Sequence, residues 1–122
     1  MTISHFNSWG RYPYELQKGS KIDWPDDVIR TLTNTPNAEY GTTLAFGCGR
    51  SYGDSCLAES KHVLAIQGMN RVVCVDWETG IIRAQAGLTL EELIGIALPH
   101  GWFLPVSPGT KFVTLGGAVA ND

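Results

Sequence analysis

The sequence is short of cysteine, of net charge and of long apolar runs, and each shortage argues against a class of protein. Its three cysteines form no CxxC pair and leave an odd one, so neither a disulfide scaffold nor a structural zinc site is expected, and no other metal site is predicted. The formal net charge is only −3, which provides no basic stripe for a nucleic-acid partner.

Membrane and export signals are equally scarce. No apolar run approaches the ~18 residues of a spanning helix, so no transmembrane segment is expected. Residues 1–6 carry neither the basic stretch nor the apolar core of a signal peptide, and a cytoplasmic location is therefore predicted. A hydrophobic content of 43% in 122 residues indicates a folded chain, either one domain or part of one.

Glycine is what the sequence has in excess. Its 14 glycines are well above the usual share of about 7%. They gather at residues 47–53 and 109–117. This clustering favours a ligand site over general chain flexibility.

The first cluster directly follows an apolar run, residues 43–46, which predicts a buried strand. A strand that runs into a glycine-rich turn can bring backbone N–H groups close to a phosphate. The glycines at 47, 49 and 53 do not match the Rossmann spacing, and no G-K-[ST] ending is present. The loop alone therefore fits two interpretations, an anion-binding loop of another kind or a tight turn between strands.

Before this loop, residues 1–22 predict an irregular arm that packs on the body through Trp9. A helix is expected to begin near Trp24 and Pro25, because acidic residues occupy its first turn, and to stop before Pro36. Its apolar residues are expected on one face.

After the loop, the pattern predicts a strand at 63–66 and a hairpin of strands at 72–76 and 81–86. Thr89 and Glu92 form an S/T-x-x-E capping box, which predicts a helix that ends at Pro99. A short extended segment is expected at 103–106.

The second glycine cluster leads into small residues at 116–118 and 120, which predict the start of a helix. Bare backbone donors at a helix N-terminus can bind an anion. Close packing of the helix on a sheet would explain the same small residues. Two such clusters in one short chain favour the ligand.

Taken together, these motifs resemble the FAD-binding domain of vanillyl-alcohol-oxidase-type (PCMH-type) flavoenzymes. The resemblance rests on G-x-G-R-S-Y-G-D, T-L-E-E-L, P-G-T and V-T-L-G-G-A-V-A-N-D, and runs from about Trp9 to Asp122. Within the family it is strongest to oxidase subunits of decaprenylphosphoryl-ribose 2-epimerases, and weaker to aldonolactone and alditol oxidases. The implied fold is α+β: a small βαβ-containing lobe plus the start of a second lobe.

The resemblance implies that FAD is the cofactor and that two loops contact it. The first would wrap the pyrophosphate, and the second would line pyrophosphate, ribityl chain and isoalloxazine. Bulk at Gly49 or Gly117 is expected to push the ligand out, whereas Cys56 is expected to be a bystander at the edge of the loop. The implied cofactor-binding residues are Phe46, Gly47, Cys48, Gly49, Arg50, Ser51, Tyr52, Gly53, Asp54, Ser55, Gly109, Thr114, Leu115, Gly116, Gly117, Asn121 and Asp122.

One departure from the family concerns the flavin linkage. Many relatives attach FAD through a histidine of the first loop, where this sequence has Arg50. His62 and His100 lie outside the loops and are expected at the surface. Tightly held but non-covalent FAD is therefore implied.

A second departure is length. The family's FAD domain is longer, and a substrate domain follows it, so we expect a partial FAD-binding domain with an arm at 1–22 and a lobe at 23–122. The catalytic residues are expected beyond Asp122. The implied activity is oxidation of a CH–OH group of a sugar, polyol or glycolipid-type substrate by hydride transfer to flavin, with a reductase partner if the protein is epimerase-like. The alternatives are a nucleotide-binding or interaction module without catalysis, and a remnant that binds nothing.

Overall fold

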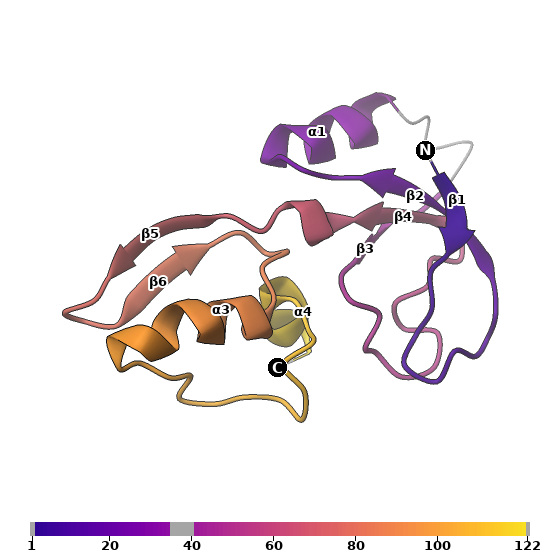
Figure 1. The fold of residues 1–122 in the computed structure, drawn as a ribbon. Helices are drawn as coiled ribbons and strands as arrows, with labels where there is room; N and C mark the ends of the chain where they lie inside the picture. Colours follow the sequence, from indigo (N-terminus) through magenta and orange to yellow (C-terminus); the bar gives the residue numbers. More distant parts are fainter. Residues whose placement is uncertain (1, 35–40, 122) are drawn as a thin grey trace.

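The computed structural model describes residues 2–34 and 41–121, which form two sheets and their covering helices (Figure 1). The elements, in chain order, are β1 (Thr2–His5), β2 (Leu16–Lys21), α1 (Pro25–Asn34), β3 (Leu44–Phe46), β4 (His62–Ala65), the 3-10 turn η1 (Ile66–Gly68), β5 (Val72–Asp76), β6 (Ile81–Ala84), α3 (Leu90–Ala97), the 3-10 turn η2 (Leu98–His100) and α4 (Leu115–Ala120).

The first sheet has the strand order β1-β2-β4-β3. β4 pairs in parallel with both β2 and β3, while β1 is antiparallel to β2. The connection β2–α1–β3 is a crossover between parallel strands, so the predicted βαβ unit and the α+β class are confirmed. β4 is the buried centre of the sheet, as its apolar Val63 and Leu64 require.

The prediction of an irregular arm over residues 1–22 is wrong. This segment supplies β1 and β2, and β2 lies inside the sheet beside β4. Trp9 is 58% exposed, so its indole is not the anchor that was expected. Leu16 is the one large apolar residue of β2 and it is exposed, while the buried positions are Gln17, Gly19 and Ser20, so apolar periodicity gave no sign of this strand.

The second sheet is the predicted hairpin, β5 paired antiparallel with β6. Its turn is held by Asp76, whose Oδ1 accepts from the N–H groups of Glu78 and Thr79 at 2.9 and 3.2 Å. α3 packs along this hairpin and begins at the predicted capping box, with both reciprocal bonds between Thr89 and Glu92 present. The expected extended segment at 103–106 joins no strand ladder among the described residues.

Apolar side chains pack in three small clusters. One surrounds Phe46 and Val63, a second lies around Ile22 and Leu64, and a third joins α3 to the hairpin and α4 through residues such as Leu93. α1 contributes no buried residue, and its predicted apolar face is largely open. In the described part of the chain, no helix has the length and apolar character to cross a membrane.

Two single-residue expectations are also corrected. Cys56 is 8% exposed and belongs to the Phe46 cluster, so it is a core residue rather than a bystander at the loop's edge. His62 is fully buried, because it starts the central strand; Ser20 Oγ lies 3.0 Å from its Nε2 and Thr43 Oγ1 lies 3.2 Å from its Nδ1. His100 is exposed as expected and stacks on Trp77, with 3.9 Å between ring centroids.

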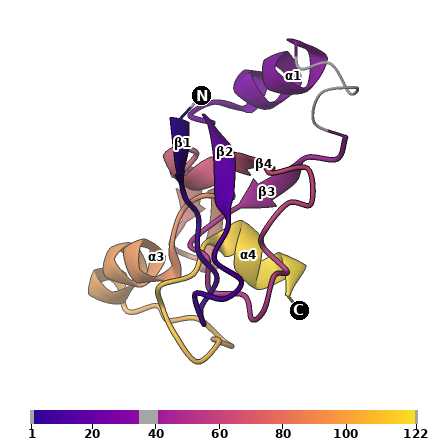
Figure 2. The same cartoon turned by 90° about the vertical axis from the view of Figure 1, so that its right-hand side faces the viewer.

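α4 lies between the two sheets, close to β3 and to the start of α3 (Figures 1 and 2). This position follows from its N-cap, Thr114, which forms an antiparallel bridge with Thr89 and is almost fully buried. The second glycine cluster is thereby brought to the end of β3, where the first cluster begins.

Candidate functional site

The two glycine-rich segments meet at Gly47 and Thr114. A Cβ placed on Gly47 would lie 2.6 Å from Thr114 Oγ1, so only glycine allows the end of β3 to pack this closely on the N-cap of α4. Segments more than 60 residues apart thus share one contact. The structure brings the clusters together, as a common ligand site requires.

The first loop carries unused backbone donors. In the described part of the chain, the N–H groups from Cys48 to Asp54 donate to no other protein group, while the residues from Arg50 to Ser55 are exposed. Gly49 and Gly53 have φ of +62° and +57°, a region that side-chain-bearing residues rarely occupy. Such a run of free N–H groups in a glycine turn can bind an anion.

Gly49 has a different role from the one expected. A Cβ there would lie 2.1 Å from the carbonyl oxygen of Asn7 and 2.8 Å from the Phe46 ring. The space is filled by the chain itself, so bulk at this position would first displace residues of the protein. Gly53, in contrast, has open space around its Cβ position.

The α4 N-terminus is not the bare donor set that the sequence suggested. The N–H groups of Leu115 and Gly116 donate to the carbonyls of Leu88 and Ala86 at 2.7 and 2.8 Å. The Gly117 N–H donates to Thr114 Oγ1 at 3.0 Å. Because protein groups accept from these three N–H groups, the prediction that the start of α4 offers free donors to an anion is wrong.

Close packing explains part of the small-residue run. A Cβ on Gly116 would lie 2.9 Å from that of Ala86, and Leu115 packs against the α3 cluster. Gly117 and Asn121 are exposed beside the junction, and Gly109 is exposed with no neighbour within 4 Å of its Cβ position. Asp122 lies outside the described residues.

Charge at the loop comes from Arg50, whose guanidinium carbon lies 5.8 Å from the centre of the Trp9 ring. Burial raises the pKa of the neighbouring Cys48 thiol, with a smaller lowering from Arg50 and a smaller rise from Glu92. Glu92 itself has a lowered pKa, because its carboxylate accepts bonds from Thr89 in the capping box. The Cys48 thiol is therefore kept neutral, and the charged side chains of the loop are the exposed Arg50 and Asp54, which are of opposite sign.

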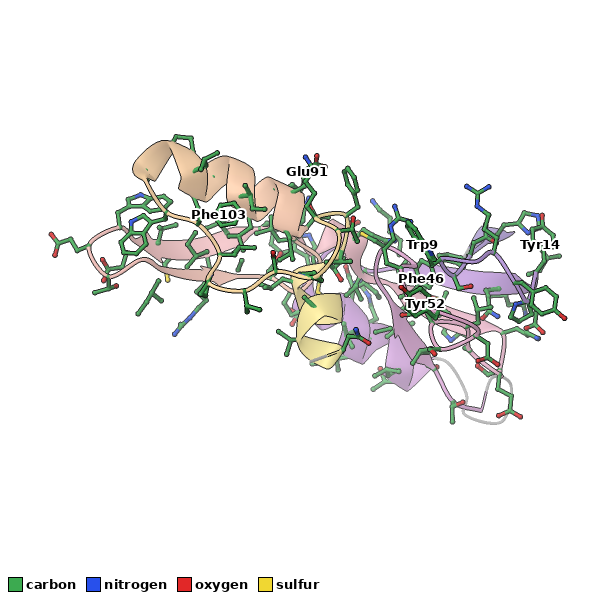
Figure 3. The ribbon with its side chains drawn as sticks, turned by 90° about the horizontal axis from the view of Figure 1, so that it is seen from below. Trp9, Tyr14, Phe46, Tyr52, Glu91 and Phe103 are labelled. Atoms are coloured by element: carbon green, nitrogen blue, oxygen red, sulfur yellow. The ribbon has the colours of Figure 1, made fainter. Side chains whose placement is uncertain are left out.

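Two residues that the motif does not include hold the loop. Gln67 Nε2 donates to the Gly47 carbonyl, and the Trp9 N–H donates to the Ser51 carbonyl at 3.0 Å. Figure 3 shows Trp9, Phe46 and Tyr52 grouped on the side of the first sheet nearer α4, with Tyr14 at its far end. The roles of Gln67 and Trp9 could not be predicted from local sequence patterns, because both residues are distant from the loop in sequence.

The parallel strands, the crossover helix and the glycine loop at the end of β3 define an α+β fold of a kind that can bind a nucleotide. The chain belongs to the FAD binding domain family, whose model matches residues 25–122. FAD is accordingly its cofactor.

Curated relatives agree with this family. The chain is 33% identical over 121 residues to decaprenylphosphoryl-β-D-ribose oxidase of Mycolicibacterium smegmatis, covering 99% of this chain and 26% of that protein. It is 33% identical over 60 residues to D-lactate dehydrogenase of Anaerostipes hadrus, covering 49% of this chain and 13% of the other. The chain thus spans about a quarter or less of the relatives it matches.

Among solved structures, cholesterol oxidase from Brevibacterium sterolicum matches 98% of this chain and 23% of its own, with a TM-score of 0.80 and 18% identity. A His121Ala variant of that enzyme gives a TM-score of 0.76 and 17% identity over the same share of this chain. At these identities the likeness shows the fold, and the predicted architecture is confirmed.

The residues of the first loop fit the cofactor. FAD carries a diphosphate with two negative charges, and the loop offers consecutive free N–H groups beside the Arg50 cation. Glycine at 49 and 53 supplies the positive φ that this turn requires.

Proposed function

We propose that this chain forms the diphosphate-binding part of an FAD-dependent oxidoreductase that acts on a CH–OH group. The observation that carries the proposal is the junction of the two glycine clusters, where unused N–H groups of the first loop adjoin the Gly47–Thr114 contact.

In this proposal the first loop, Phe46 to Ser55, binds the diphosphate. Each hydrogen bond to a charged oxygen contributes about 1.5–3 kcal/mol, so two or three of them contribute about 3–9 kcal/mol. The Arg50 guanidinium adds an attraction that salt screens at this exposed position. Riboflavin has no phosphate and FMN has one, so both should bind less tightly than FAD.

The second cluster is proposed to contact the cofactor through its exposed residues, and not to bind the diphosphate with N–H groups at the start of α4. Thr114 is buried and packs against Gly47 at the start of the loop, while the half-buried Gly116 packs on Ala86. The exposed members of the cluster, Gly109, Gly117 and Asn121, are proposed to line the cofactor. Asp122 is proposed with them on the basis of the family motif.

The redox chemistry would be the cofactor's, because a flavin held by this loop would supply the acceptor for a hydride from the substrate carbon. Relatives are named for a decaprenylphosphoryl ribose and for D-lactate, and each of these substrates carries a hydroxylated carbon. We accordingly propose a sugar, polyol or glycolipid-type substrate. A reductase partner belongs to the same proposal if the protein acts as half of an epimerase.

Non-covalent attachment of FAD is also part of the proposal. His5 stacks on Tyr14, His62 is buried in the first sheet and His100 stacks on Trp77. His62 lies against Ser20 and Thr43, so each of the three imidazoles has a partner outside the first loop. Acid precipitation should therefore release FAD intact into the supernatant, and flavin that stays with the denatured chain would contradict this.

Titration of the apo-protein with FAD, FMN and riboflavin, followed by flavin fluorescence, tests the site. FAD should bind at least tenfold more tightly than FMN, and equal affinities would overturn the proposal. Anaerobic addition of sugars and polyols to the FAD-loaded protein then tests the activity. Bleaching of the flavin absorbance is expected with at least one CH–OH donor, and a protein that binds FAD but is bleached by none would support a binding module without catalysis.

A further inference from the structure

We propose that Gln67 and Trp9 are positioning residues for the cofactor loop, acting through two of its carbonyl groups. Each donates a hydrogen bond to a loop carbonyl from a distant part of the chain. Together they fix the direction in which the loop's free N–H groups point. The inference rests on the proposed role of this loop in binding the FAD diphosphate.

Gln67 holds the first peptide of the loop. It lies in η1, directly after β4, and β4 is the parallel neighbour of β3. Its side chain reaches the end of β3 and donates from Nε2 to the Gly47 carbonyl. In a planar trans peptide the C=O and the following N–H point in opposite directions, so this bond turns the Cys48 N–H away from Gln67.

Trp9 holds a second peptide four residues further along the loop. Its backbone N–H donates to the Ser51 carbonyl at 3.0 Å, and by the same geometry the Tyr52 N–H points away from the N-terminal segment. Two contacts beside this bond keep the segment in place. The Asn7 carbonyl fills the space beside Gly49, and the Phe6 ring packs edge-on against Phe46 at 4.9 Å.

The segment that carries Trp9 is itself held. The pairing of β1 with β2 fixes both its ends. Ser8 is only 3% exposed and donates from Oγ to the Tyr12 carbonyl at 3.4 Å, while the Arg11 N–H closes a turn onto the Ser8 carbonyl at 3.1 Å. An anchor of this kind can orient the loop before the cofactor arrives, which lowers the ordering cost of binding.

Residue 9 lies outside the region matched by the FAD binding domain family, which begins at residue 25. The glycine motif therefore carries only part of the site. The N-terminal segment and η1 supply the rest, and both approach the loop from the protein side. This arrangement leaves the opposite side of the loop for the diphosphate.

Two pairs of proteins test the proposal in the full chain. Gln67→Met keeps the size of an exposed side chain but removes its donor, and is compared with the parent. Trp9→Pro removes the backbone donor and is compared with Trp9→Ala, which keeps it. Three quantities are measured for each: the dissociation constant for FAD, the two ³¹P resonances of bound FAD, and the thermal unfolding midpoint of the apo-protein.

Gln67→Met and Trp9→Pro should each weaken FAD binding about five- to tenfold and shift the ³¹P resonances toward those of free FAD. Trp9→Ala should change the affinity less than threefold and leave both resonances in place. For Gln67→Met the apo-protein should unfold at the parental midpoint, which separates positioning from a purely structural role. Parental affinity and resonances in Gln67→Met would overturn the proposal, even if Trp9→Pro does not fold. A parent that binds FAD no better than riboflavin would instead overturn the proposed function.

Discussion

The contrast between Gly49 and Gly53 gives the sharpest mutational prediction for the loop. Both glycines have a φ near +60°, so alanine at either position should cost about 1–2 kcal/mol for the left-handed conformation. Only at Gly49 would the new methyl group collide with the chain, at 2.1 Å from the Asn7 carbonyl oxygen. At Gly53 nothing lies within 4 Å.

The collision adds an overpacking cost of about 1–3 kcal/mol, so Gly49→Ala should lose about 2–5 kcal/mol in total. Small domains have about 5–15 kcal/mol of stability, and the variant should fold with a clearly lower urea midpoint. Gly53→Ala is the matched control, because it carries the conformational cost without the collision.

Urea unfolding of the two apo-proteins, followed by circular dichroism, measures the difference directly. The Gly49→Ala loss should exceed the Gly53→Ala loss by at least about 1 kcal/mol. Equal losses would refute the packing of the N-terminal segment on the loop. Gly49→Ala should also weaken FAD binding, since relief of the collision moves the loop or the segment that holds it.

Three further outcomes are expected. The pKa of His62 is lowered, mainly by burial and to a smaller extent by the charge of Lys18. Below about pH 6.5 the unfolded chain therefore binds more protons than the folded chain does. The free energy of unfolding should therefore fall as pH drops below that value, by up to about 1.4 kcal/mol per pH unit. Urea titrations of a His62→Asn variant should show a smaller dependence of the unfolding free energy on pH, and the same dependence in both proteins would contradict the prediction. Gly117→Val, whose Cβ would lie 2.9 Å from Thr114 Oγ1, should weaken FAD binding at least tenfold in a fluorescence titration, whereas Cys74→Ser on the exposed face of β5 should leave it unchanged; unaltered binding in Gly117→Val would remove this residue from the site. The isolated 122-residue chain should self-associate in analytical ultracentrifugation, because Ile29 on α1 is 64% exposed and Val119 on α4 is 75% exposed, and a monomer at high concentration would argue against it.

Local patterns predicted the elements that local chemistry determines. The capping box of Thr89 and Glu92 marked the start of α3, and alternating apolar residues on either side of a glycine turn marked the β5–β6 hairpin. The strand into the glycine loop was also visible, but the prediction that it is buried is wrong, because β3 lies at the edge of the sheet and both Leu44 and Ala45 are exposed. In each case the signal lies within about ten residues of the element that it predicts.

What depends on distant contacts could not be predicted in this way. His62 looked like a surface residue because nothing near it in sequence shows that Ser20 and Thr43 accommodate its ring. The donors at the α4 N-terminus looked free because their acceptors, the carbonyls of Leu88 and Ala86, belong to another segment. The strands of residues 1–22 were missed for the same reason, since β2 is specified by its pairing with β4.

The central claim is that the N–H groups of the first loop bind the FAD diphosphate. Selective ¹⁵N-glycine labelling of the full protein, with amide spectra taken during titration by FAD and by riboflavin, tests it most directly. The amide signals of Gly49 and Gly53 should shift with FAD and stay in place with riboflavin, while that of Gly80, in the turn of the β5–β6 hairpin, should move with neither. Loop signals that FAD leaves unmoved, or that riboflavin moves equally, would contradict the claim.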